Sequence, residues 1–285
     1  MEAFTSQLAR AVDGDPTAIH RARVASRRLR EAISGAGLRA EDKLLRGELR
    51  SVGKALGTVR ELDVTLHVLR ERHGNTANSS IAINVLSRQV AHARANARKR
   101  LARTLTAGKI ERLARKLSDA ATALDAREGA GGRKFSMTWR WVADTRLARR
   151  AGALSEAIES AGTVYSTTTL HRVRIATKKF RYALELASET RPIPHATQHL
   201  ATLKTLQGLL GDLQDLSVLL SWAYQLQGSA ILDLATLRAL SAFSRALEND
   251  CRYLHARFMR HRNQLLALTG RMDAESSMHQ ERVAS

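Results

Sequence analysis

The sequence predicts an all-α protein, because its composition, its few helix breakers and its hydrophobic spacing all favour helices. The chain has 285 residues, of which only three are proline and 4% are aromatic, while 44% are hydrophobic. Helix-favouring Ala, Leu, Arg and Gln dominate, and runs of β-branched residues are missing. Between the breaks, apolar residues recur at helical spacing. This much apolar content also excludes a disordered basic tail.

Proline, glycine and polar clusters mark where the expected helices begin and end. Asp15-Pro16 is a favourable helix start, because the fixed φ of proline suits the first helical position. Gly35 to Gly37 and Arg191 to Pro194 interrupt later helices, and loops are expected at residues 75–80 and 128–136. The amphipathic segments between these breaks lie near residues 17–35, 41–72, 81–126, 137–161, 167–189, 196–227 and 230–268.

Two motifs occur twice, in the same order. His20 to Ile33 reads HRARVASRRLREAI and His171 to Leu184 reads HRVRIATKKFRYAL, with six identical positions. Leu49 to Leu66 reads LRSVGKALGTVRELDVTL, and Leu203 to Leu220 reads LKTLQGLLGDLQDLSVLL. The offsets of the two pairs, 171 − 20 = 151 and 203 − 49 = 154, are nearly equal. Such spacing predicts an internal duplication.

The duplication predicts two pseudo-symmetric helical bundles. We expect them as an N-terminal lobe over residues 1–135 and a C-terminal lobe over 136–285 of one domain that covers residues 1–285. The glycine-rich stretch 129–132 is the expected lobe boundary, since it has the composition of a flexible linker. After Gly270 the chain is expected to fray.

The charge balance predicts a polyanionic partner. Lys and Arg number 46 against 27 Asp and Glu, so the net charge is 46 − 27 = +19. Residues 1–150 hold 31 − 15 = +16 of this charge, and residues 151–285 hold 15 − 12 = +3. A surface this basic attracts nucleic acid, anionic membrane or polyphosphate.

Several classes of protein are excluded or disfavoured. No stretch reaches the 18 or so apolar residues that a membrane span needs, so no membrane partner is expected. The N-terminus lacks the basic and apolar regions of a signal peptide, which predicts a cytoplasmic protein. Cys251 stands alone, which excludes an internal disulfide and a cysteine-based zinc site. His195 and His199 have the spacing of a metal-binding pair, but no third ligand is identifiable.

The first motif forms a row of donors along one side of a helix. At 100° per residue, four side chains of each copy fall within an arc of about 80°. We call these residues the basic faces: His20, Arg23, Arg27 and Arg30 in the first copy, and His171, Arg174, Lys178 and Arg181 in the second. A separate flank carries Arg21 and Arg28 in the first copy, and Arg172 and Lys179 in the second, and these cations are also candidate anion-binding residues.

The opposite side of this helix is expected to face the core, through Ala22, Ala25, Leu29, Ala32 and Ile33. Like charges in one row repel each other, and the only nearby carboxylates, Glu31 and Glu185, lie at the ends of the rows. An anionic ligand would relieve this repulsion. An ordinary solvated helix face is the alternative, which the repeated order of residue types disfavours.

The second motif contributes glycines, carboxylates and further cations. Gly57 and Gly211 are expected at a turn or a close helix approach. Its carboxylates are interpreted as partners of nearby arginines rather than as a metal or acid–base site. These carboxylates are Glu61, Asp63, Asp212 and Asp215. The cations expected to extend the basic faces are Arg50, Lys54, Arg60 and Lys204. Arg252 on the last helix is expected either to line the same cationic surface or to belong to a solvated stripe.

At these residues the sequence resembles the CHAD family, the conserved histidine α-helical domain. The resemblance rests on H-x-x-R-[VI] at His20 and His171, and on L-G-x-x-x-[DE] at Leu56 and Leu210, and covers essentially the whole chain. It implies two helical bundles around a basic groove or channel that binds inorganic polyphosphate, with localisation to polyphosphate granules in some members. The site residues it implies are the two basic faces. The sequence departs from the family pattern at Lys178, Lys179, Phe180 and Glu61.

The function we expect is therefore non-catalytic polyphosphate binding, with no cofactor. An enzyme is disfavoured because no nucleotide-binding loop and no repeated acidic cluster accompanies the cations. A sequence-nonspecific nucleic-acid binder is the alternative, which the scarcity of aromatic residues disfavours. An accessory subunit of a polyphosphate or triphosphate enzyme is a further alternative.

Overall fold

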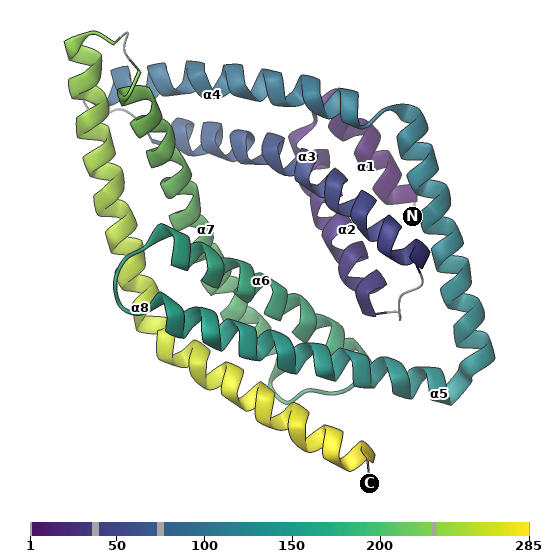
Figure 1. Cartoon of the computed structure of the whole chain (residues 1–285). Coiled ribbons are helices and arrows are strands. Elements are labelled where there is room, and N and C mark those ends of the chain that lie inside the picture. Colours follow the sequence, from purple (N-terminus) through teal and green to yellow (C-terminus); the bar gives the residue numbers. More distant parts are fainter. Residues whose placement is uncertain (1, 36–39, 73–76, 230–231, 285) are drawn as a thin grey trace. The chain divides into compact units, whose positions relative to one another are not determined.

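All the regular secondary structure among the residues that the structure describes is helical. This computed structural model describes residues 2–35, 40–72, 77–229 and 232–284, and the all-α prediction is confirmed there (Figure 1). The helices are α1 (Glu2–Asp13), α2 (Pro16–Gly35), α3 (Ala40–Glu71), α4 (Ala77–Thr104), α5 (Ala107–Ala161), α6 (Thr167–Thr190), α7 (Ala196–Gln227) and α8 (Leu234–Ala284). None of the described helices is long and apolar enough to cross a membrane.

The chain divides into two compact units within α5. The N-terminal unit is Met1–Ser136 and the C-terminal unit is Met137–Ser285. Their net charges are 27 − 14 = +13 and 19 − 13 = +6. The loop predicted over residues 128–136 is wrong, because α5 continues through it. Glycine lowers helix stability by about 1 kcal/mol per residue but does not forbid a helix, and elongation from formed turns is easier than starting anew.

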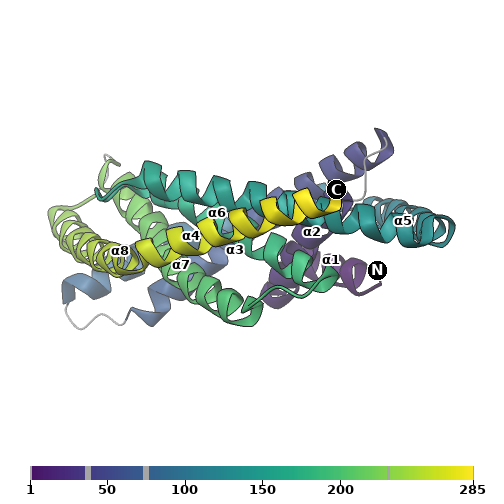
Figure 2. The same cartoon turned by 90° about the horizontal axis from the view of Figure 1, so that it is seen from below.

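Four other features differ from the sequence prediction. The segment 81–126 is broken at residues 105–106, where α4 gives way to α5, and α4 begins at Ala77, inside the loop predicted over 75–80. Residues 75–76, the start of that loop, lie outside the described part. Helix α1 was not predicted, and α8 continues to Ala284 (Figure 2) instead of fraying after Gly270. Burial of Met272, which is 1% exposed, anchors this extension in the core.

In the N-terminal unit, α2 packs against α1 and α3, and α3 packs against α4. The predicted start of α2 at Pro16 is confirmed. Asp15 caps the helix, because its Oδ1 accepts hydrogen bonds from the backbone N–H groups of Thr17 (2.8 Å) and Ala18 (3.2 Å). These two bonds and the nearby Arg10 guanidinium hold the pKa of Asp15 below its usual range.

Arg98 of α4 secures the turn between α1 and α2. Its Nη2 donates to the carbonyl oxygen of Asp13 at 2.7 Å. Gly14, the next residue, has φ +94°, and a Cβ there would lie 1.6 Å from Arg98 Nη2. The turn therefore requires glycine both for its backbone conformation and for the space that the guanidinium occupies.

Replacing Gly14 with alanine should destabilise the N-terminal unit by about 1–2 kcal/mol, because φ is unfavourable and Arg98 must move. We expect the melting temperature to fall by about 3–6 °C in calorimetry. The matched control is Gly47→Ala in α3, where a Cβ has no neighbour within 4 Å. Alanine favours the helix there, so that variant should melt at or above the original temperature. Equal melting temperatures for the two variants would contradict this account of the turn.

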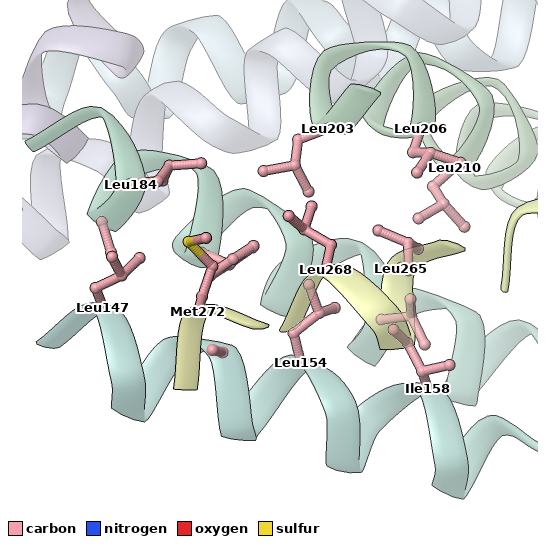
Figure 3. Close-up of a cluster of buried hydrophobic side chains, with 14 of the residues drawn as sticks. Leu147, Leu154, Ile158, Leu184, Leu203, Leu206, Leu210, Leu265, Leu268 and Met272 are labelled. Carbon is pink, nitrogen blue, oxygen red and sulfur yellow. The ribbon is translucent and has the colours of Figure 1, made fainter. Parts of the chain in front are cut away.

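The C-terminal unit has a core to which all four of its helices contribute. Figure 3 shows Leu147 and Leu154 of α5, Leu184 of α6, Leu203 of α7 and Leu268 of α8 side by side. The N-terminus of α6 is capped by Ser166, whose side chain accepts a hydrogen bond from Thr169 N–H. Its C-terminal end is tied to α5, because Arg191 Nε donates to Asp144 Oδ1 at 2.8 Å. The Arg191–Asp144 ion pair joins the end of α6 to α5, and α6 also packs against α7.

Candidate anion-binding site

The two basic faces lie on α2 and α6, and their side chains have the same pattern of exposure. His20 and His171 are exposed, and the three cations that follow each histidine are half-buried. The flank residues Arg21, Arg28, Arg172 and Lys179 are exposed in both copies. Half-burial restricts a long side chain, so fewer conformations are lost when it binds a ligand. The internal duplication itself stays a prediction.

The basic face lies beside the buried side of its helix, not opposite to it. On α2 the buried residues are Ile19, Ala22, Ser26 and Ile33. The basic residues at 20, 23 and 27 each follow a buried residue by one position, which is about 100° around the helix. Ala25 and Leu29, which were expected in the core, are only half-buried. The side chain of Ala32 lies outside the described part.

Helix α3 approaches α2 closely enough to orient Arg23. A Cβ at Gly53 would lie 3.2 Å from Ser26 Oγ, and one at Gly57 would lie 3.6 Å from the Arg23 guanidinium. Arg23 Nη1 donates to the Gly57 carbonyl oxygen at 3.4 Å. Gly57 thus lies inside α3 rather than at a turn, and a Cβ there would make only ordinary van der Waals contact with Arg23, so the predicted need for glycine is not met. The same prediction for Gly211 is wrong, because a Cβ there would have no neighbour within 4 Å.

In the C-terminal unit, two glutamines of α7 hold the two ends of the basic face. His171 Nδ1 lies 2.5 Å from Gln214 Oε1, and Arg181 Nε donates to Gln207 Oε1 at 3.0 Å. The glutamines are 214 − 207 = 7 residues apart, which places them on the same side of α7. Sequence comparison of the repeats missed them, because the matching positions in the first copy are Gly53 and Arg60.

Arg181 is also partly neutralised. It forms an ion pair with Glu185, one turn along α6, and its guanidinium lies 4.6 Å from the centre of the Tyr182 ring. We expected that Glu185, at the end of the row, would not neutralise the basic face. This expectation is wrong for Arg181, which pairs with Glu185. The spacing of four residues was the available signal. The side chain of Glu31, the corresponding candidate on α2, lies outside the described residues.

Two carboxylates of the second motif, Asp63 and Asp212, interact with arginines from other helices. Asp63 is 6% exposed and lies 2.5 Å from Nε of Arg94, which α4 contributes and which sequence analysis did not single out. Burial raises the pKa of Asp212, and the positive charge of Arg257 on α8 opposes that rise. Among the described residues, no group of three or more His, Cys, Asp or Glu side chains could hold a metal ion.

The cations expected to extend the basic faces lie on three helices. Arg50 and Lys54 are exposed on α3, and Lys204 is exposed on α7. Arg252 on α8 is 65% exposed, and its guanidinium contacts Glu248 at 3.5 Å and Asn249 at 3.3 Å. Arg252 is therefore an accessible cation whose charge a neighbouring carboxylate offsets in part.

One histidine outside the basic faces, His255, has a pKa below its usual range. His255 of α8 packs edge-on against Tyr165, with ring centroids 5.5 Å apart. Burial raises the pKa of Tyr165 to about 12 and lowers the pKa of His255. Protonation of His255 therefore lowers the stability of the folded protein.

The pKa of His255 predicts a pH effect on stability. The unfolded chain binds this proton more readily than the folded protein does. The contribution of His255 to stability is therefore fully present above the ordinary histidine pKa of about 6.5, and it is lost as the pH falls from there through the lower pKa of the folded state. In calorimetry without ligand, His255→Gln should lose less of its melting temperature between pH 7.5 and 5.5 than the original protein. His92→Gln, at an exposed position of α4, should behave like the original protein. Identical losses in all three proteins would refute the assignment.

Comparison with known proteins places this arrangement in a family. The family model for the CHAD domain matches residues 1–224. No curated protein sequence matches significantly. Similar solved structures include PptA from Streptomyces chartreusis, with a TM-score of 0.57 and 18% identity over 97% of this chain and 95% of that chain. The CHAD domain from the plant Ricinus communis has a TM-score of 0.51 and 21% identity over 97% and 91%. With more than half of its residues matched, this chain belongs to the CHAD domain family.

Proposed function

We propose that this protein binds inorganic polyphosphate through the basic faces of α2 and α6, without catalysis. The observation that carries the proposal is the matched exposure of the two faces, with one exposed histidine and three half-buried cations in each. Membership of the CHAD family supports a role with polyphosphate or triphosphate in general. Location on polyphosphate granules is part of the proposal.

The dimensions of each face suit a linear anion. From His20 to Arg30 the helix rises about 15 Å, so the four side chains offer a row of donors rather than a single point. Polyphosphate is flexible and carries about one charge per phosphate, and it has no bases to recognise. Arginine and lysine supply charge-assisted hydrogen bonds to its oxygens, and histidine adds charge as the pH falls.

The two faces hold their cations in different ways. In the N-terminal unit, Arg23 donates a hydrogen bond to the Gly57 carbonyl of α3, and Arg50 and Lys54 are exposed on the same helix. In the C-terminal unit, Gln207 and Gln214 orient the ends of the face. Lys178 has the charge of arginine but not its two-pronged geometry, so it should bind phosphate less directionally. Lys204 and Arg252 are proposed as outer contacts.

A competition titration tests the proposal. Labelled long-chain polyphosphate is bound to the protein, and unlabelled polyphosphate or duplex DNA is added at equal phosphate concentration. We expect unlabelled polyphosphate to displace the label at much lower concentration than DNA does. If DNA or single-stranded RNA displaces it equally well, the protein is a general nucleic-acid binder. Exposed Tyr253, whose ring lies 6.0 Å from the Arg257 guanidinium, is the feature that would favour that outcome.

A further inference from the structure

A groove between α5 and α6 in the C-terminal unit is separate from the basic face. It has a volume of about 290 Å³. Its lining comes from Arg150, Ala153, Glu156, Ala157 and Ser160 of α5, and from Arg172, Ile175, Ala176 and Lys179 of α6. In Figure 1 the two helices run alongside each other within this unit. Both flank cations of the second repeat thus line a groove of their own.

The groove and the basic face lie on different sides of α6. The basic face contacts α7, as the hydrogen bonds of His171 to Gln214 and of Arg181 to Gln207 establish. Arg172 and Lys179 lie about 130° further around the helix, toward α5. One anion along the side of α6 that faces α7 would therefore leave Arg172 and Lys179 uncovered.

The lining combines positive charge with apolar surface. Arg150, Arg172 and Lys179 outnumber the one carboxylate, Glu156. The small side chains of Ala153, Ala157 and Ala176 leave room for a close approach to both helices, and Ile175 is 37% exposed. A bare phosphate chain gains nothing from exposed isoleucine. A ligand with both carboxylates and apolar side chains satisfies the whole surface.

We propose that this groove receives an acidic amphipathic helix of a partner protein. Charge complementarity with the three cations selects the acidic residues, and Ile175 and the alanines receive the apolar side of the helix. The α5 residues that line the groove span positions 150–160, a rise of about 15 Å, which matches about three turns of a docked helix. This role goes beyond polyphosphate binding and leaves the basic face of α6 available.

The experiment uses the full-length protein and three fluorescent peptides of about 14 residues. The first peptide has a strip of leucine and alanine along one helical side, with glutamate along both edges of that strip. The second keeps the glutamates but replaces leucine with serine, and the third keeps the leucines but replaces glutamate with lysine. In anisotropy titrations at physiological salt, only the first peptide should bind. Failure of the first peptide to bind, or equal binding of the second, would overturn the proposal.

Variants locate the binding. Arg172→Ala with Lys179→Ala should weaken the first peptide about fivefold to tenfold, as expected for two ion pairs at a groove edge, and Ile175→Ser should also weaken it. The matched control is Arg21→Ala with Arg28→Ala, which removes two flank cations from α2 and should leave peptide binding unchanged. If Arg174→Ala weakens the peptide more than the groove variants do, the peptide binds the basic face and the groove proposal fails. Polyphosphate binding is measured in parallel, so the two proposals fail independently.

Discussion

Replacing Arg23 and Arg174 together with alanine should weaken polyphosphate binding by about 100-fold or more. Each is half-buried on its basic face, and a hydrogen bond to a charged group contributes about 1.5–3 kcal/mol. Two such losses correspond to at least two factors of ten in affinity. Arg23 Nη1 donates to the Gly57 carbonyl at 3.4 Å, so the stability of the variant is measured together with its affinity. Isothermal titration calorimetry measures the affinity, and circular dichroism measures the helix content.

The flank provides a control of equal charge on the same helices. Arg21→Ala with Arg172→Ala removes the same number of charges, but from exposed positions that lie about 120° or more around each helix from its half-buried cations. We expect only a small loss of affinity there, from the weaker overall field. If the flank variant loses as much as the Arg23 and Arg174 variant, net charge rather than the basic face governs binding. Unchanged affinity in the Arg23 and Arg174 variant would place the site elsewhere.

Raising the salt concentration from 50 to 200 mM should weaken polyphosphate binding by about 1,000-fold or more. A linear polyanion releases condensed counter-ions when cations neutralise it, and six to ten phosphate contacts give losses of this size on nucleic acids. The basic faces offer eight side chains, three cations and one histidine in each copy. Titrations at four or five salt concentrations give the slope of log affinity against log salt.

The Arg23→Ala, Arg174→Ala variant provides a second reading of the salt experiment. Each lost phosphate contact should make the slope shallower by about 0.7–0.9, so the variant should differ from the original protein by about 1.5. The flank variant should keep the original slope. A flat salt response in the original protein would contradict ionic binding along the faces.

Local sequence was enough to predict much of the fold and the composition of the basic faces. The helical class, the start of α2 at Pro16 and the row from His20 to Arg30 depend on propensities and on spacing within a few residues. The carboxylate of Asp15 and the proline after it lie in the same turn that they stabilise. Such features are readable because the interacting groups are neighbours along the chain.

The glycine-rich stretch 129–132 shows where prediction from local sequence failed. The composition predicts a loop, yet α5 runs through it, and the division of the chain into two compact units falls within this helix. Helix propagation and the burial of flanking residues such as Leu117 and Leu147 outweigh a few unfavourable propensities. The same reason explains α8, where burial of Met272 extends a helix that its composition suggested would fray.

What the sequence by itself determined is which residues carry the charge and in what order along each helix. Tertiary structure alone decided what these residues contact. Arg23 bonds to the Gly57 carbonyl, His171 to Gln214, and Asp63 to Arg94. It also decided that the basic face lies next to the buried side of its helix, and that Arg172 and Lys179 line a groove with α5. The physical reason is that these partners are 31 to 43 residues apart in sequence, or lie on helices whose contacts depend on side-chain packing. No local periodicity encodes which neighbour a helix face will meet.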